Sequence, residues 1–476
     1  MTNCNYCEPL TRRRLLQNAA CGFGSVALAG LLNENRATAA PMAPKLSQFA
    51  PRAKRVIFLF MAGGVSHVDS FDYKPVLERY DGTLREFNDA RNLARTGKGS
   101  KSRVMKPLWR FAQRGQSGKW TSDLFPEMSR RVDDLCFLHG MQTEGVAHGP
   151  ATLFLHTGAT NLVRPSVGSW ISYGLGTENQ NLPGFMVLNP SLANGGPRNY
   201  GSAFLPAVYQ GTPVGRPGMP TKDFKIRNLL NSSRSPQDQQ AQFDLVQALN
   251  REQLQSRPRD TELEAVIDSY ELAFRMQQHA PDAIDLSFET RETLDLYGID
   301  KPATDNFGRQ CLMARRLAES GVRYIQVNYT DNSNNPAWDQ HTDMPKHAMH
   351  AAAVDRPIAA LLIDLKQRGL LEDTLVWWGG EFGRNPFAEN NGTGRDHNPN
   401  GFTVWLAGGG IKPGISYGAT DDFGHFAIEQ KVHMHDLHAT ILHLLGFNHK
   451  ELTYRYAGRN FRLTDVAGKV VEDILA

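Results

Sequence analysis

The stretch RVIFLFMAGG at residues 55–64 decides the predicted fold, because it is a continuous apolar run that stops at two glycines. A strand that is buried on both faces reads as such a run, whereas a half-buried strand alternates apolar and polar residues. The sequence repeats this pattern as LCFLHGM (135–141), GFMVLN (184–189), VRYIQVNY (322–329), TLVWWGG (374–380) and FTVWLAGGG (402–410). We therefore predict that these runs are buried strands.

Helical patterns lie between several of these strands. One surrounds SVGSWISYGL, and two longer ones end at Gly321 and Gly369, the residue type that commonly terminates helices. Alternation of strands with helices indicates an α/β fold in which a doubly wound, mainly parallel sheet lies between helical layers. Between residues 222 and 300 the sequence is polar, Gln-rich and periodic at helical spacing, so we expect a helical insertion there.

The N-terminus has the pattern of an export signal. TRRRLLQ (11–17) precedes a weakly apolar, Gly/Ala-rich run, and ATAAPMA (37–43) follows it. We predict that residues 1–39 are a twin-arginine signal peptide, that residues 40–476 form the mature domain, and that the protein is periplasmic or otherwise extracytoplasmic. The alternative is a basic patch before a short core helix. The apolar run is too short and too glycine-rich to span a membrane, so we expect no integral membrane segment after signal removal.

Charge and cysteine content narrow the functional classes. Removing the signal's four Lys+Arg and two Asp+Glu from 52 and 49 leaves 48 and 47, a nearly neutral chain. Such a balance gives no reason to expect a nucleic-acid partner or a basic membrane-binding surface. Cys4, Cys7 and Cys21 fall in the signal, which leaves Cys136 and Cys311 and no disulfide framework.

Four clusters of chemically reactive side chains lie beside the predicted strands, where ligands bind in open parallel sheets. They offer Ser66, His67, Asp69 and Asp72; Asp339 and His341; Glu381 and Arg384; and Arg395, Asp396 and His397. Each cluster alone also fits turn-forming residues. Together, the carboxylates would repel one another at one sheet edge unless cations separated them, so we predict a site for a divalent metal.

The ligand types restrict the metal and the chemistry. Mixed Asp, Glu and His ligands suit zinc, manganese or iron better than magnesium, and calcium would accept the carboxylates. One or two ions could clamp the oxygens of a phosphate or sulfate ester during displacement. Arg384 or Arg395 could hold a non-bridging oxygen, although a salt bridge at the sheet rim explains either arginine equally well.

Several motifs carry a resemblance that covers nearly all of the mature chain: FMAGGVSHVDSFDYKP, HGPATLFLHTG, AWDQH, GGEFGRNP, GRDHNPNGF and HMHDLHATILHLLGF. With them the sequence resembles the alkaline phosphatase and sulfatase superfamily, specifically its exported domain-of-unknown-function 1501 branch. The resemblance implies metals held at strand ends by an Asp/His pair, which Asp339 and His341 would form, and by a later His, which His397 would supply. Glu381 would stand in an altered Asp-His dipeptide, with Phe382 at the position of the His. AGG replaces the acidic residue at the end of the first strand, so Asp69 or Asp72 would supply that ligand.

HGPATLFLHTG at residues 148–158 is similar to the sulfatase nucleophile turn in its length, its proline and its final Thr-Gly. His148 stands at the nucleophile position, and the turn contains no cysteine. We therefore expect His148 to point into the metal pocket, as a nucleophile, a base or a ligand; the alternative is a structural histidine bonded to a neighbouring backbone carbonyl.

Two functional hypotheses follow. One is an exported metal-dependent hydrolase of phosphate or sulfate esters that acts on a small-molecule or polysaccharide ester substrate. The other is a non-catalytic exported protein that keeps the fold and binds a metal, a polysaccharide or another partner.

Overall fold

The computed structural model describes residues 42–226, 235–256, 261–330, 336–389 and 392–476. The expected signal, residues 1–39, and its cysteines Cys4, Cys7 and Cys21 lie outside the described residues. Cys136 lies in a strand and Cys311 in a helix, as their sequence surroundings predict.

In the described part of the chain, nine strands form one central sheet in the order β14-β6-β13-β10-β1-β9-β7-β8, and β17 also pairs with β6. Their bounds are β1 Arg55–Met61, β6 Cys136–Gln142, β7 Phe185–Leu188, β8 Thr212–Val214, β9 Tyr324–Tyr329, β10 Thr374–Gly379, β13 Phe402–Ala407, β14 Ile415–Tyr417 and β17 Val432–His433. All residues of β1, β7, β10 and β13 are buried, which is why they read as apolar runs in the sequence.

Strand β13 runs opposite to the rest of the sheet. It pairs antiparallel with both β10 and β6, whereas all other pairs of the described sheet are parallel: β10 with β1, β1 with β9, β9 with β7, β7 with β8, and β6 with β14 and β17. The sheet is therefore mainly parallel, as predicted. Because β13 is reversed, the residues that precede it lie at the edge where the parallel strands end.

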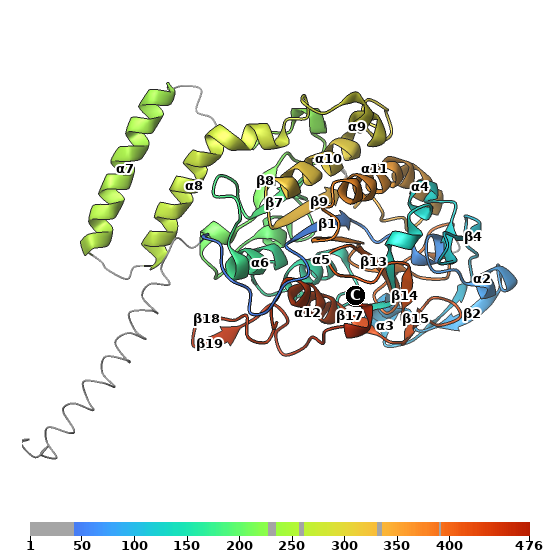
Figure 1. The fold of residues 1–476 in the computed structure, drawn as a ribbon. Helices are drawn as coiled ribbons and strands as arrows, with labels where there is room; N and C mark the ends of the chain where they lie inside the picture. The colour runs from blue at the N-terminus through green and yellow to red at the C-terminus, as the bar shows by residue number, and fades with distance from the viewer. Residues whose placement is uncertain (1–41, 227–234, 257–260, 331–335, 390–391) are drawn as a thin grey trace, which may run out of the picture.

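Alternate residues of β1 enter two different hydrophobic cores. Ile57, Leu59 and Met61 pack in the core of α4 Pro126–Ser129, α10 Asp305–Glu319 and α11 His347–Gln367. Phe58 and Phe60 belong to the core of α5 His148–Thr157, α6 Val167–Leu175 and α12 Met434–Leu444. The sheet thus lies between two helical layers, which Figure 1 shows on its opposite faces.

The stretch expected to be a helical insertion contains α7 Pro236–Ser256, α8 Thr261–Ile284 and α9 Arg291–Leu296. Helices α7 and α8 extend away from the sheet in Figure 1, and the rings of Phe243 and Phe274 stack between them at a centroid distance of 4.4 Å. Within the described residues, no helix combines the length and the apolar character that crossing a membrane requires.

Shorter strands and helices lie outside the central sheet. The paired short strands are β2 Leu84–Phe87 with β3 Ser100–Arg103, β4 Phe111–Arg114 with β5 Lys119–Ser122, β11 Gly383–Arg384 with β12 His397–Asn398, β15 Ala419–Thr420 with β16 Ala427–Glu429, and β18 Tyr454–Tyr456 with β19 Arg459–Phe461. The short helices nearby are η1 His67–Asp69, α2 Pro75–Arg79 and α3 Ala90–Thr96.

Candidate metal centre

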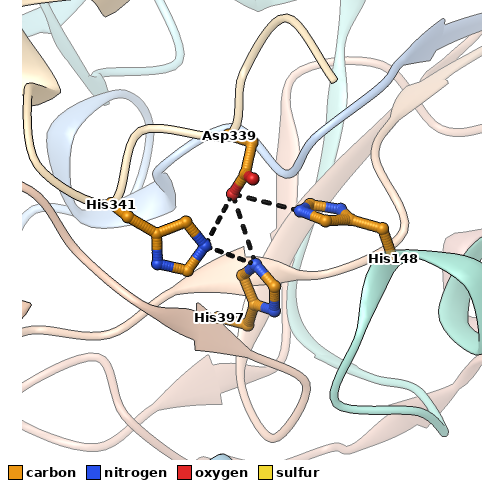
Figure 2. Close-up of side chains that lie close together, drawn as sticks. All are labelled: His148, Asp339, His341 and His397. Atoms are coloured by element: carbon orange, nitrogen blue, oxygen red, sulfur yellow. Dashed lines mark hydrogen bonds and ion pairs between the residues drawn. The ribbon is translucent and has the colours of Figure 1, made fainter. Parts of the chain in front are cut away.

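Four side chains from three separate segments meet at this edge of the sheet. His148 is the first residue of α5, Asp339 and His341 lie in the loop after β9, and His397 begins β12 shortly before β13. Figure 2 shows that all four point toward one centre. One ligand atom of each lies within 4.8 Å of those of the other three. We call these four residues the ligand cluster.

The three imidazoles of the ligand cluster aim the same ring atom, Nε2, at one oxygen. Asp339 Oδ1 lies 3.0 Å from His148 Nε2, 2.9 Å from His341 Nε2 and 3.3 Å from His397 Nε2. The Nε2 atoms of His341 and His397 are 3.0 Å apart. His148 Nε2 is buried and has no partner in hydrogen-bonding alignment among the described residues, despite its distance from Asp339.

The other ring nitrogen of each imidazole, Nδ1, donates a hydrogen bond to an oxygen outside the ligand cluster. His148 Nδ1 donates to Glu381 Oε1 at 2.6 Å, His397 Nδ1 donates to the carbonyl oxygen of Val146 at 2.8 Å, and His341 Nδ1 donates to Glu389 Oε2. A neutral imidazole that donates from Nδ1 presents an unprotonated Nε2. Three lone pairs and a carboxylate oxygen therefore face one centre.

The convergence of these side chains shifts the pKa values of Asp339, His341 and His148. Burial would raise the pKa of Asp339, but the three imidazoles and the Arg384 guanidinium hold it well below its usual range. Burial would lower the pKa of His341, yet Asp339 and Glu389 raise it to about 9. The pKa of His148 is also raised, against burial, by Asp339 and Glu381. In the absence of a metal ion, protons between these atoms offset the repulsion of facing lone pairs.

The donor set fits a divalent cation. Three imidazole nitrogens and one carboxylate oxygen are a common ligand set for zinc, and histidine ligands typically donate their second nitrogen to a carboxylate or carbonyl. Tetrahedral ligands at about 2.0–2.1 Å from zinc are separated from one another by about 3.3 Å. Four of the six separations among the Nε2 and Oδ1 atoms of the ligand cluster, 2.9–3.3 Å, are close to that spacing.

Gly63, just after β1, allows two segments of the site to approach each other closely. Gly63 has a φ of +113°, and a Cβ there would lie 2.7 Å from the backbone nitrogen of Asp339. Its own N–H donates to both carboxylate oxygens of Glu381, at 3.0 and 3.1 Å. Gly63 therefore allows the Asp339 loop to approach the end of β1. It also anchors Glu381, which was expected to be a metal ligand but here orients His148.

Arg384 is fully buried and bound on several sides. Its guanidinium donates to Asp339 Oδ1 at 2.7 Å and to the carbonyl oxygens of Gly63, Gly64, Trp338 and Arg395. These contacts fit the alternative explanation of Arg384 as part of a salt bridge at the sheet rim. The arginine supports the Asp339 carboxylate from the side of the protein interior.

The structure does not bring Asp69 or Asp72 into the ligand cluster. Asp69 forms a fully buried ion pair with Arg395, at 2.7 Å, and Asp72 pairs with Lys74 at 3.1 Å. Each carboxylate thus already has a cationic partner. The two other candidates of this segment, in and beside η1, also have partners within the fold: Ser66 Oγ donates to Asp69, and His67 Nε2 donates to the carbonyl oxygen of Gly424.

Two carboxylates outside the ligand cluster lie close to His341. Glu389, which the sequence analysis missed, and Asp396 both approach His341 Nδ1, with Asp396 Oδ1 at 3.6 Å. The three residues also have the spacing of a possible metal site. Because His341 donates its Nδ1 proton to Glu389, we describe both carboxylates as supports of His341. Glu389 stands in an ordinary polar loop sequence, which carries no signal for this role.

Phe382 covers one side of the cluster. Its ring stacks on His397 at a centroid distance of 4.3 Å and lies 5.0 Å from His148. An apolar ring at this position limits the access of water to the two imidazoles, whereas the His expected there by resemblance would have added a ligand.

Residues 53–475 match the family described as protein of unknown function, DUF1501. The chain belongs to this family, as its motifs predict. A comparison with curated proteins gives no match.

Several solved structures are similar to the chain at low identity. One, i-CgsB in complex with k-i-k-neocarrahexaose, is 12% identical with a TM-score of 0.38, covering 83% of this chain and 72% of that one. A sulfatase from Pseudoalteromonas sp. is 13% identical with a TM-score of 0.35, covering 83% and 68%. An alkaline phosphatase variant with magnesium bound is 10% identical with a TM-score of 0.33, covering 84% and 99%. Sulfatases and alkaline phosphatases are the proteins that the sequence motifs resemble.

Proposed function

We propose that the protein is an exported, metal-dependent hydrolase of phosphate or sulfate esters, acting on a small-molecule or polysaccharide ester. The observation that carries this proposal is the arrangement of the three imidazoles. Each donates Nδ1 outward and aims Nε2 at Asp339 Oδ1. Such orientation by outer hydrogen bonds is typical of metal ligands.

In this proposal His148, Asp339, His341 and His397 hold one divalent cation, with zinc or manganese favoured by the nitrogen-rich donor set. With its coordination expanded beyond the four protein ligands, the bound cation would polarise an ester oxygen or lower the pKa of a bound water to about 7. Glu381 and Glu389 fix the orientation of two of the imidazoles, and Arg384 holds the carboxylate. These residues supply a preorganised and largely buried site, which is what electrostatic catalysis requires.

His148 occupies the position of a sulfatase nucleophile, and its contacts favour the role of a ligand. Its Nδ1 is held by Glu381, and its Nε2 faces the same centre as the other two imidazoles. A histidine nucleophile would need Nε2 free to attack the substrate. We therefore propose that water, rather than His148, attacks the ester.

The test is metal analysis of the purified protein followed by assays on aryl phosphates, aryl phosphate diesters and aryl sulfates. We expect close to one equivalent of a divalent metal and hydrolysis of at least one ester class. Both should be lost in His148→Ala and His397→Ala. The matched control is His443→Ala, a half-buried histidine of α12 outside the ligand cluster, which should retain both.

The outcomes separate the remaining roles. If His148→Ala keeps the metal and loses hydrolysis, His148 acts as a nucleophile or base. If the wild type binds the metal without hydrolysing any of these esters, the non-catalytic binding protein becomes the better hypothesis. A wild type that binds no divalent metal contradicts the proposal.

Export by the twin-arginine route is part of the proposal and rests on the sequence TRRRLLQ alone. This route carries folded proteins, which suits a site loaded with metal before export. Replacing Arg12 and Arg13 with lysine should hold the precursor in the cytoplasm, as measured by fractionation and immunoblotting. Unchanged export of that double variant would contradict the assignment.

A further inference from the structure

A polar cavity of about 480 Å³ lies directly beside the ligand cluster, between α3, β3 and the loop that carries Glu389. Glu389 and Asp396 form part of its wall. Both carboxylates approach His341 from this side. The His341 imidazole therefore separates the cavity from the centre at which the four ligands meet. We call this cavity the α3 cavity.

Four cationic side chains line the α3 cavity. Arg91 and Arg95 come from α3, and Lys101 and Arg103 come from β3. The same wall carries three carboxylates, those of Asp89, Glu389 and Asp396. What the cavity can bind thus depends on which of these charges already have partners.

The carboxylates of the α3 cavity are all occupied by partners of the protein. Asp89 accepts from the backbone N–H of Asn92 and from the side chain of Asn385, both at 2.6 Å. Asp396 accepts from the backbone N–H of His397 at 2.8 Å, and Glu389 is bonded to His341.

Of the four cations of the α3 cavity, Arg103 is held by the protein, because it donates to the carbonyl oxygen of Gly392 at 2.6 Å, whereas the other three are less engaged. Lys101 is exposed, and its side chain has neither a hydrogen bond nor an ion pair to any described residue. Arg95 has one long contact, 3.4 Å to Asn92 Oδ1. Arg91 uses a single guanidinium nitrogen for Asp396, at 3.0 Å, and this carboxylate raises the pKa of Arg91. Free guanidinium and ammonium donors that face a shared cavity are suited to bind sulfate or phosphate oxygens.

We propose that the α3 cavity binds a second sulfate or phosphate group, carried by the same substrate whose ester is hydrolysed at the ligand cluster. This inference rests on the proposed function. Its consequence is a substrate class: a molecule with at least two oxyanion groups, one at the metal and one beyond His341. The volume falls within the range of small-ligand pockets, so the cavity can take an oxyanion together with part of its carrier.

The test uses simple probes that bridge the two sites without a known substrate. Alkane bisphosphonates with spacers of increasing length are titrated into zinc-loaded protein by calorimetry, with methylphosphonate as the single-anion reference. We expect at least one spacer to bind about tenfold or more tightly than methylphosphonate, because the second contact becomes intramolecular. The gain should disappear in the double variant Arg95→Gln/Lys101→Gln.

The control variant is Arg114→Gln/Lys98→Gln, which removes the same two residue types at exposed positions outside the α3 cavity. It should keep the full gain. If no spacer improves binding, or if the gain survives in Arg95→Gln/Lys101→Gln, the inference is wrong.

Zinc-free protein separates this inference from the proposed function. If the chain binds no divalent metal, the proposed function fails. In that case, binding of inorganic sulfate that is weakened only by Arg95→Gln/Lys101→Gln would assign the cavity to a free anion, which also overturns the shared-substrate proposal. If zinc binds and the spacer series shows no gain, the proposed function survives and only the inference falls.

Discussion

The ligand cluster makes a sharp prediction for Asp339→Asn, a nearly isosteric change that removes one negative charge. Asp339 Oδ1 is the atom that all three imidazoles approach, and the side chain is only 5% exposed. A structural four-ligand zinc site contributes about 10–16 kcal/mol, so an equal share for one ligand is roughly 3 kcal/mol. That corresponds to about a 100-fold loss of zinc affinity.

We expect Asp339→Asn to lower the free energy of unfolding by a limited amount. Removing one partner of a buried ion pair costs about 3–5 kcal/mol when the remaining charge is left alone. Arg384 keeps four carbonyl acceptors after the change, and His341 can lose its proton because the Asp339 carboxylate that raises its pKa is gone. We therefore expect a destabilisation below about 3 kcal/mol and a protein that still folds.

The assay is competition for zinc between the metal-free protein and a chromogenic chelator, with circular dichroism to confirm folding. Asp72→Asn is the matched control, because Asp72 is also a buried carboxylate with a cationic partner, Lys74, and lies outside the ligand cluster. It should leave the affinity within about twofold, well under the tenfold that 1.4 kcal/mol represents. The reasoning is refuted if folded Asp339→Asn binds zinc within about threefold of wild type, or if Asp72→Asn loses as much affinity.

Three further results are expected. Glu381→Gln should weaken zinc binding by about 10–100-fold in the same chelator assay, because it loosens the hydrogen bond that orients His148; unchanged affinity would contradict that role. Gly63→Ala should lower the free energy of unfolding by about 2 kcal/mol or more, measured with urea, since its positive φ and the approach of Asp339 leave no room for a methyl group; wild-type stability would show that the loop adjusts freely. Zinc affinity should rise between pH 6.5 and 9, because His341 loses its proton over this range. The stability of the metal-free protein should show the opposite trend, since the contribution of the raised His341 pKa is complete below about pH 6.5 and is lost as pH rises through about 9. If zinc affinity and the stability of the metal-free protein changed in the same direction with pH, the assignment would be contradicted.

The central strands could be predicted closely from sequence, because burial on both faces leaves a direct record in the residues. The run at 55–64 contains β1, Arg55–Met61, and the run at 374–380 contains β10, Thr374–Gly379. The reversal of β13 could not be predicted in this way. An apolar run identifies a buried strand and carries no information about its direction, which here is set by how the connection from β10 through the residues around His397 returns to the sheet.

That reversal explains how His397 reaches the ligand cluster, which Asp69 does not join. In a fully parallel sheet, a residue just before a strand lies at the edge opposite to the strand ends, so His397 would be remote from Asp339. The antiparallel course of β13 places its start at the ligand edge. Asp69 follows the end of β1 and satisfies the simple rule of position, but the fully buried Arg395 pairs with it first. Proximity to a strand end therefore selects candidates, and competition among neighbouring charges decides which of them remain free to bind a metal.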